Sequence, residues 1–420
     1  MPPETEAACL LRSGLAFPSR VGLVETDGNL VFAGFKPGGF ALYLGDEPYF
    51  HFDLEGRWQR ALVSGTHFLK ELNGSVEAID RRRVADALTL HRRRLSLAET
   101  LDLDASIRSV ALRLIQALQD GSIHLESPPE PGREVSHSDL LSMLDRIADW
   151  DDAAWFRQRE RYLATYAPSG FLPPSCPSPI VLQASVLEDA SRGFSPVPAV
   201  LRTPGEFADH VRSVAALLGR RAVQARGLVI QHGDFWNQPA EVIRPYLERA
   251  SEVFPLSSKT TRPRLSERSM DEPMLDGFYA FLPNLSGLGP DRVGWAMLTQ
   301  LGLRRVDLGA DSVFSVDRET LKSRVRDLQD AGIGVGLVLL LGAEPGRSTD
   351  EEAQATVSLV NDLGLRPNDH VYLMEAPEVL EAPSADQPEP EPRIPSVRAR
   401  LLQTRPKGGY RVVPYSLSKQ

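Results

Sequence analysis

From residue 180 onward, short runs of apolar residues alternate with segments in which apolar residues recur at helical spacing. The short runs are typical of buried strands, and the segments between them of amphipathic helices. Several of these helices are followed by a glycine, as at Gly302, Gly332 and Gly364, which suits the left-handed cap that ends many helices. The pattern predicts a parallel sheet covered by helices. The expected strands are residues 180–187, 228–232, 277–282, 305–308, 334–341 and 371–375.

Six such strand–helix units fit an α/β domain over residues 176–380. They are compatible with a partial (β/α)6 barrel of the TIM type and also with a doubly wound sheet. The pattern of apolar and polar residues alone leaves both architectures open.

The chain before this region has a different pattern. Residues 1–126 predict a small α+β module, in which apolar runs joined by turn pairs such as Asp27-Gly28 precede a helix over residues 97–118. Residues 127–175 read as a linker and helical connector, with a helix expected over residues 138–166. Residues 381–396 are rich in Pro and Glu and are expected to be a disordered linker, followed by a C-terminal tail at 397–420.

Composition narrows the class of protein. The chain has 420 residues, a net charge of −9 and 42% apolar residues, which is typical of a globular protein and argues against a nucleic-acid scaffold. Two short basic runs, Arg81–Arg83 and Arg92–Arg94, are interpreted as a solvated face, with an anion or partner site as the alternative. No signal peptide and no membrane span are visible, so a cytoplasmic location is expected. Cys9 and Cys176 give no disulfide framework.

Candidate chemistry is expected at one edge of the predicted sheet. Functional residues of parallel α/β folds collect on the loops that follow the carboxyl ends of the strands. On those loops the candidates are Glu188, Arg192 and Ser195 after the first strand, Gly233 and Asp234 after the second, Asp311 and Ser312 after the fourth, and Gly342 after the fifth.

Four segments in this region, taken in order, resemble the radical S-adenosylmethionine (radical SAM) superfamily. Residues 304–312 are similar to its fourth strand, and residues 330–346 to its fifth strand with the glycine-rich loop that follows. His232-Gly233-Asp234 stands where the family has a Gly-Gly-Glu-like motif. Residues 194–198 resemble the end of its cluster-binding loop. The resemblance covers residues 178–380 and implies the partial barrel.

One departure from the family decides the functional expectation. The family binds a [4Fe–4S] cluster through three cysteines, and the resemblance assigns those positions to Glu188, Arg192 and Ser195. Iron–sulfur clusters are held by cysteine thiolates, and a guanidinium has no lone pair with which to ligate iron. No metal site and no [4Fe–4S] cluster are therefore expected, and the chain is interpreted as a pseudoenzyme with a binding, scaffolding or regulatory role.

A ligand site is still implied. In the family, the loops after the second and fourth strands hold S-adenosylmethionine, so the resemblance makes Gly233, Asp234, Asp311, Ser312 and Gly342 candidates for binding that cofactor or another small polar ligand. From the residues alone, Asp311-Ser312 equally suits a helix cap, and Gly342 a tight turn.

Other functions remain open at this point. One alternative is an enzyme of the superfamily with an unusual or partner-supplied cluster. Another is a cluster-free acid–base or metal enzyme that uses carboxylates of the barrel mouth. No catalytic residue is assigned. The expected partners are a small polar ligand and a protein, with neither nucleic acid nor membrane.

Overall fold

The computed structural model describes residues 19–25, 30–45, 47–84, 87–126, 136–167, 172–176, 178–187, 199–231, 235–257, 274–282, 289–344, 346–375, 393–406 and 409–415. Within these ranges, it describes the backbone alone for residues 19–25, 30, 81–84, 87–90, 124–126, 186–187 and 199. The chain divides into two compact units. Unit 1 comprises residues 1–165, 215–224 and 261–273, and unit 2 comprises residues 166–214, 225–260 and 274–420.

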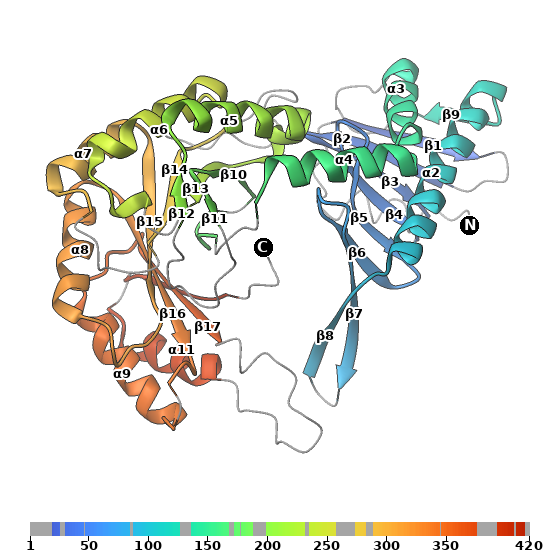
Figure 1. The fold of residues 1–420 in the computed structure, drawn as a ribbon. Coiled ribbons are helices and arrows are strands. Elements are labelled where there is room, and N and C mark those ends of the chain that lie inside the picture. Colours follow the sequence, from blue (N-terminus) through green and yellow to red (C-terminus); the bar gives the residue numbers. More distant parts are fainter. Residues whose placement is uncertain are drawn as a thin grey trace. The chain divides into compact units, whose positions relative to one another are not determined.

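Unit 1 is built on a nine-stranded antiparallel sheet in the order β8-β7-β6-β5-β4-β3-β2-β1-β9 (Figure 1). β2 and β3 form a tight hairpin in which Lys36 pairs with Gly39, and Gly38 in its turn has a φ of 71°, a conformation that favours glycine. The strands are β1 (Ser19–Glu25), β2 (Leu30–Lys36), β3 (Gly39–Leu44), β4 (Tyr49–Asp53), β5 (Trp58–Val63), β6 (Thr66–Lys70), β7 (Val76–Val84), β8 (Ala87–Arg94) and β9 (Ile123–Glu126).

Helices α2 (Leu97–Asp120), α3 (His137–Ala148) and α4 (Asp152–Thr165) complete unit 1. α2 begins at a capping box formed by Ser96 and Glu99 and ends at Gly121, whose φ of 78° is the expected left-handed cap. The single helix expected over residues 138–166 is broken at Asp149–Asp151, where Asp151 accepts a hydrogen bond from the backbone N–H of Ala154 and so starts a new helix.

A buried ion pair stabilises the core of unit 1. The ammonium group of Lys70 contacts both carboxylate oxygens of Asp104 at 2.5 Å, and Trp58 donates its indole N–H to the same carboxylate at 2.6 Å. The ammonium also lies 3.5 Å from the ring centroid of Trp155 on α4. Burial lowers the pKa of Lys70 to about 8, although Asp104 opposes the shift.

Unit 2 contains a seven-stranded sheet whose neighbouring strands are all parallel and follow in sequence order. Figure 1 shows helices α5 to α9 on one face of this sheet. A doubly wound sheet reverses its strand order and carries helices on both faces, so that alternative is wrong. The strands are β10 (Pro179–Gln183), β13 (Gly227–Gln231), β14 (Phe278–Leu282), β15 (Leu303–Ala310), β16 (Gly334–Leu341), β17 (His370–Glu375) and β18 (Arg411–Pro414).

The connecting helices of unit 2 match the amphipathic segments of the sequence. A short antiparallel pair, β11 (Ser185–Leu187) and β12 (Ala199–Leu201), follows β10. The helices are α5 (Pro204–Leu218), the 3-10 helices η1 (Gly219–Gln224) and η2 (Phe235–Asn237), α6 (Ala240–Val253), α7 (Arg292–Gln300), α8 (Arg318–Asp330), α9 (Thr349–Asp362) and α11 (Arg393–Thr404). The end of α5 and all of η1 cluster with unit 1.

The C-terminal residues extend the parallel sheet. α11 begins at Arg393, inside the segment expected to be a disordered linker, and packs on α9. β18 then pairs with β17 as a seventh strand, from His370 opposite Arg411 to Leu373 opposite Pro414. In the described part of the chain, no helix combines the length and the apolar character that a membrane span requires.

Candidate functional site

Functional residues are expected at the carboxyl edge of the parallel sheet, and the structure describes part of that edge. Of the residues selected from the sequence, Glu188, Arg192, Ser195, Gly233 and Asp234 lie outside the described residues. Asp311, Ser312 and Gly342 are described, at the ends of β15 and β16.

Ser312 is buried just after β15, whereas its neighbour Asp311 is exposed. The hydroxyl of Ser312 accepts a hydrogen bond from the backbone N–H of Phe314 at 3.1 Å, which is the geometry of a local turn. The N-cap of the following helix, α8, is Asp317 instead, which accepts from the N–H groups of Glu319 and Thr320. Ser312 therefore shapes the loop at the sheet edge, and the capping role considered for Asp311-Ser312 belongs to Asp317.

Gly342 follows β16 with a φ of 79°, which favours glycine and supports the turn interpretation. Its backbone N–H donates to Oε1 of Glu352 at 2.9 Å, so this donor is already engaged by the protein. Glu352 is only 2% exposed although it lies in the first turn of α9.

Glu352 belongs to a buried charge network that the sequence did not reveal. Arg393, the first residue of α11, donates to Oε2 of Glu352 at 2.8 Å and to the backbone oxygen of Arg347 at 3.2 Å. The backbone N–H groups of Arg393 and Ile394 both donate to Oε1 of Glu375, at the end of β17. Burial is the main cause that raises the pKa of Glu375, and the nearby Glu352 adds to it. This network fastens α11 to the carboxyl edge of β16 and β17.

The face of the sheet opposite the helices carries both apolar and polar residues. One apolar cluster there comprises Phe281, Val338, Leu340, Tyr372 and Met374. These residues alternate along their strands with side chains that pack against the helices.

Asp307, at the middle of β15, has no exposed surface. Its Oδ2 accepts the backbone N–H of Ser175 at 3.1 Å. Its Oδ1 and the hydroxyl of Ser175 are buried without a hydrogen-bond partner among the described residues. Burial raises the pKa of Asp307 to about 6. An aspartate between Val306 and Leu308, in the buried part of the strand, was the available sequence signal for this group.

Cys176 is the cysteine whose position bears on the iron–sulfur question. It lies before β10, at the amino end of the sheet, is 6% exposed and packs with Val229 and Tyr279. The cluster loop of the resemblance follows the carboxyl end of β10, and β10 itself spans about 16 Å between the two ends. The donor set therefore does not fit a [4Fe–4S] cluster, which needs three thiolates, because the chain has two cysteines in all. Within the described residues, no group of three or more His, Cys, Asp or Glu side chains is arranged to hold a metal ion.

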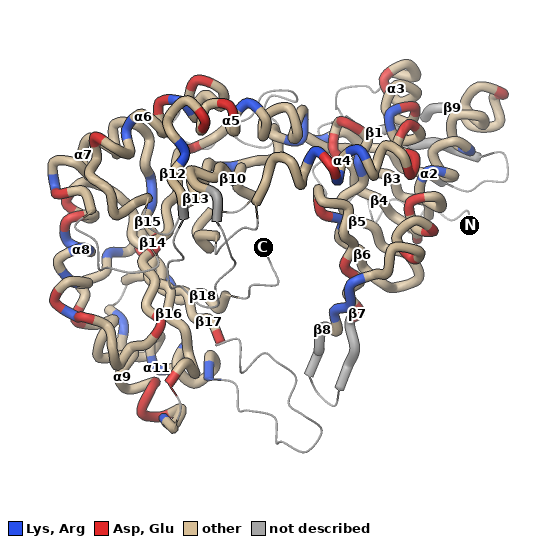
Figure 2. Tube along the Cα trace, viewed as in Figure 1, with Lys and Arg blue, Asp and Glu red and all other residues tan. Residues whose placement is uncertain are grey.

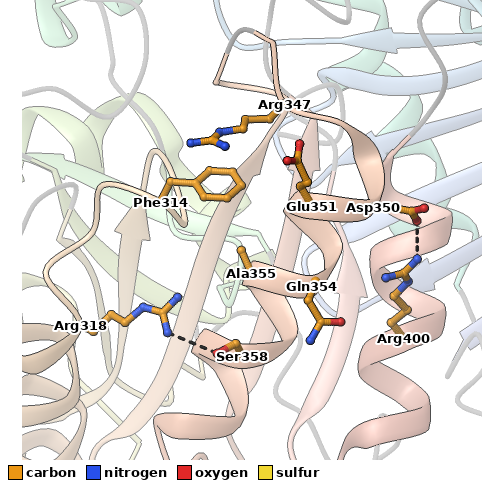
Figure 3. A pocket seen from close by; sticks show the side chains of 9 residues that line it. All are labelled: Phe314, Arg318, Arg347, Asp350, Glu351, Gln354, Ala355, Ser358 and Arg400. Atoms are coloured by element: carbon orange, nitrogen blue, oxygen red, sulfur yellow. Dashed lines mark hydrogen bonds and ion pairs between the residues drawn. The ribbon is translucent and has the colours of Figure 1, made fainter.

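A groove of about 710 Å³ lies on the helix-covered side of the sheet, among the loop after β15 and helices α8, α9 and α11 (Figure 3). Its central feature is the guanidinium of Arg347 over the ring of Phe314, 4.7 Å from the centroid. Arg318 donates to Ser358 at 3.3 Å, and Arg400 pairs with Asp350. Two of its three arginines are thus engaged by neighbours that also line the groove.

Comparison with known proteins adds little to this description. No model of a protein family matches the chain, and no curated protein matches it. Among solved structures, the chain is similar to the crystal structure of HydG, a maturase of the [FeFe]-hydrogenase. The identity is 11%, the match covers 76% of this chain and 71% of that chain, and the TM-score is 0.30. A likeness of this size carries no argument about function, so the inferences below rest on the residues of the chain itself.

Proposed function

We propose that this chain is a radical SAM-like protein that has lost its iron–sulfur ligands and acts as a binding, scaffolding or regulatory pseudoenzyme. The sequence segments described above support the family, and the sequential parallel strand order of unit 2 is compatible with the partial barrel that we propose for residues 176–380.

The observation that carries the proposal is the position of Cys176. It is buried at the amino end of the sheet, and Cys9 is the one other cysteine of the chain. Neither the number nor the placement of the sulfur atoms suits a cluster with three protein thiolates. Glu188, Arg192 and Ser195, which stand at the corresponding positions, offer a carboxylate, a guanidinium and a hydroxyl in place of thiolates.

Anaerobic reconstitution of the full chain with iron and sulfide tests this proposal. We expect substoichiometric iron after desalting, no visible charge-transfer band and the same iron content in a Cys9→Ser/Cys176→Ser variant. Binding of about four irons per chain that disappears in this variant, together with release of 5′-deoxyadenosine after S-adenosylmethionine and a one-electron reductant are added, would reject the pseudoenzyme.

We further propose that the barrel mouth retains a site for a small polar ligand, with Gly233, Asp234, Asp311, Ser312 and Gly342 around it. Because the N–H of Gly342 is bound to Glu352, we assign the polar contacts to the side chains of Asp234 and Ser312. Calorimetric titration with S-adenosylmethionine and adenosine should show binding that weakens at least tenfold in Asp234→Asn. Equal binding by this variant would remove Asp234 from the site, and no heat from either compound would remove both as ligands.

A further inference from the structure

Strands β7 and β8 form a ribbon that extends past the rest of their sheet. They pair along their whole length, from Glu77 opposite Arg94 to Val84 opposite Ala87. β6 pairs with β7 only as far as Ile79, opposite His67. Beyond Ile79, therefore, the hairpin is two-stranded in the described sheet, and β8 is an edge strand.

This ribbon concentrates positive charge in an acidic protein. Residues 76–94 contain six arginines, Arg81–Arg83 and Arg92–Arg94, against three carboxylates, Glu77, Asp80 and Asp86, whereas the whole chain has a net charge of −9. Figure 2 shows the basic residues where the described parts of β7 and β8 meet the sheet. The projecting part is about five residues, or 17 Å, long, which exceeds the Debye length of about 8 Å at physiological salt. The positions of Arg81–Arg83 in this projecting part are accordingly screened from the acidic remainder of the chain, whereas Arg92–Arg94 lie at its base.

The register distributes these arginines over both faces, unequally. Opposed residues of an antiparallel pair share a face, and alternate residues return to it. One face therefore holds the positions of Arg81, Arg83, Arg92 and Arg94, together with Ile79, Leu88, Leu90 and one acid, Glu77. The other face holds the positions of Arg82 and Arg93.

Two simpler roles explain part of this charge. Arg92 pairs with Glu77 at 2.9 Å and Arg93 with Glu99 at 2.8 Å, so these two arginines have local partners. Charged residues on an edge strand also discourage pairing with other sheets. Arg81–Arg83 lie where β7 no longer pairs with β6, so edge protection applies to both strands of the ribbon. A few charges are enough for that role, however, and it does not require several arginines on one face.

We propose that the β7–β8 ribbon is a docking arm for an extended acidic segment of a partner protein. Same-face positions of a strand repeat about every 6.8 Å, so carboxylates on alternate residues of an extended segment match the spacing of Arg81 with Arg83, and Arg94 lies on the same face. The apolar positions between the arginines suit the apolar residues of such a segment, and β8 offers an edge to which a strand can be added. A nucleic-acid backbone would use the arginines and leave Leu88 and Leu90 without contacts. This inference goes beyond the proposed function and does not depend on it.

Fluorescence anisotropy with the full chain tests the proposal. The probe is a labelled peptide of alternating Glu and Val with eight residues, the length of β8. A Lys–Val peptide and a duplex DNA of mixed sequence serve as competing probes. The arm variant is Arg81→Glu/Arg83→Glu/Arg94→Glu. The matched control is Arg157→Glu/Arg159→Glu/Arg161→Glu, which makes the same charge change at three exposed positions of α4 in the same unit.

We expect saturable binding of the Glu–Val peptide, at least tenfold weaker in the arm variant and within about twofold of wild type in the control. We also expect wild-type binding to weaken steeply as salt is raised from about 50 to 300 mM, because exposed charges are screened. If circular dichroism shows that the arm variant is misfolded, the neutral Arg81→Gln/Arg83→Gln/Arg94→Gln variant replaces it. Three results would overturn the proposal: no saturable binding, equal binding by arm variant and wild type, or tighter binding of the DNA than of the peptide.

Discussion

The carboxylate of Asp307 lies against the backbone of Gly336 on the adjacent strand. The two residues pair across β15 and β16, and a Cβ added to Gly336 would come within 1.9 Å of Oδ1 of Asp307. Gly336 is thus required here by the space that a neighbouring side chain occupies. The same carboxylate binds the backbone N–H of Ser175, so one buried acid joins β15 to the segment that precedes β10.

Gly336→Ala is therefore expected to destabilise unit 2. The new methyl group would displace Asp307 or strain the sheet, and overpacking of this kind typically costs about 1–3 kcal/mol. Urea denaturation of the full chain, followed by tryptophan fluorescence, measures the loss in free energy of unfolding.

Two further variants test whether the loss of stability comes from the clash between the new methyl group and the carboxylate of Asp307. Gly205→Ala, on α5, places its Cβ no closer than 3.9 Å to another residue and should change stability by less than about 0.5 kcal/mol. Asp307→Ala/Gly336→Ala should be more stable than the sum of its single variants predicts, because the alanine methyl then fills the space that the carboxylate leaves. Strict additivity would show that the two side chains do not compete for this space.

The raised pKa of Asp307 makes a prediction about pH. An aspartate in an unfolded chain has a pKa of about 3.9, whereas burial raises that of Asp307 to about 6. Between these values the folded state binds more protons than the unfolded state, so stability falls as pH rises through this window and stays lower above it. Two pKa units correspond to about 3 kcal/mol, as an order of magnitude.

Asp307→Asn removes this titration while retaining an oxygen that can accept the N–H of Ser175. Relative to wild type, the variant should therefore become more stable as pH rises from about 4 to 7, by about 2–3 kcal/mol. The measurement is the difference in free energy of unfolding between variant and wild type at each pH, which cancels the titration of other groups. A difference that is constant with pH would contradict the buried, high-pKa assignment.

The strands and helices of unit 2 were predictable because each strand is a short apolar run and each helix has one apolar face. The expected strands at 228–232, 277–282, 334–341 and 371–375 correspond closely to β13, β14, β16 and β17. In unit 1, β5 and β6 are harder to predict from the sequence, because polar Gln59 and His67 interrupt their apolar pattern. β18 is a four-residue strand whose place in the sheet depends entirely on pairing with β17.

The contacts of the candidate site are harder to predict from the sequence than the fold is. The sequence shows which polar residues follow the strands, but the contacts of these residues depend on others far away in the chain. Gly342 was selected as a ligand contact, yet its N–H is bound to Glu352. The partners in that network, Glu352 and Arg393, are 41 positions apart and follow no local pattern.

The buried pair of Lys70 and Asp104 gives a prediction for unit 1. Lys70→Met leaves the Asp104 carboxylate buried without its cation, and breaking a buried pair in this way typically costs about 3–5 kcal/mol. Hydrogen–deuterium exchange should quicken in peptides of α2 and of α4, since Lys70 also contacts Trp155. Lys70→Met/Asp104→Asn keeps an acceptor for the indole N–H of Trp58 and should recover most of the loss. A double variant as unstable as the single one would show that the ammonium matters through its packing and ring contacts instead of its charge.

Arg393 should control whether the C-terminal segment stays on the sheet. Its guanidinium neutralises Glu352, which is 2% exposed, and its backbone N–H binds Glu375. Arg393→Met leaves Glu352 without a cation in a buried position, for which we expect a loss of about 2–4 kcal/mol at neutral pH. Because β18 follows α11 in the chain and contacts it, the amides of residues 411–414 should exchange markedly faster, whereas those of β13 and β14, far from β17 in the strand order, should be almost unchanged. Arg398→Met, at an exposed position of the same helix, removes a charge without touching the network and should leave exchange in β18 as in wild type. If both variants loosen β18 equally, the segment is held by the general charge of α11, and the contacts of Arg393 with Glu352 and Glu375 are not what retains it.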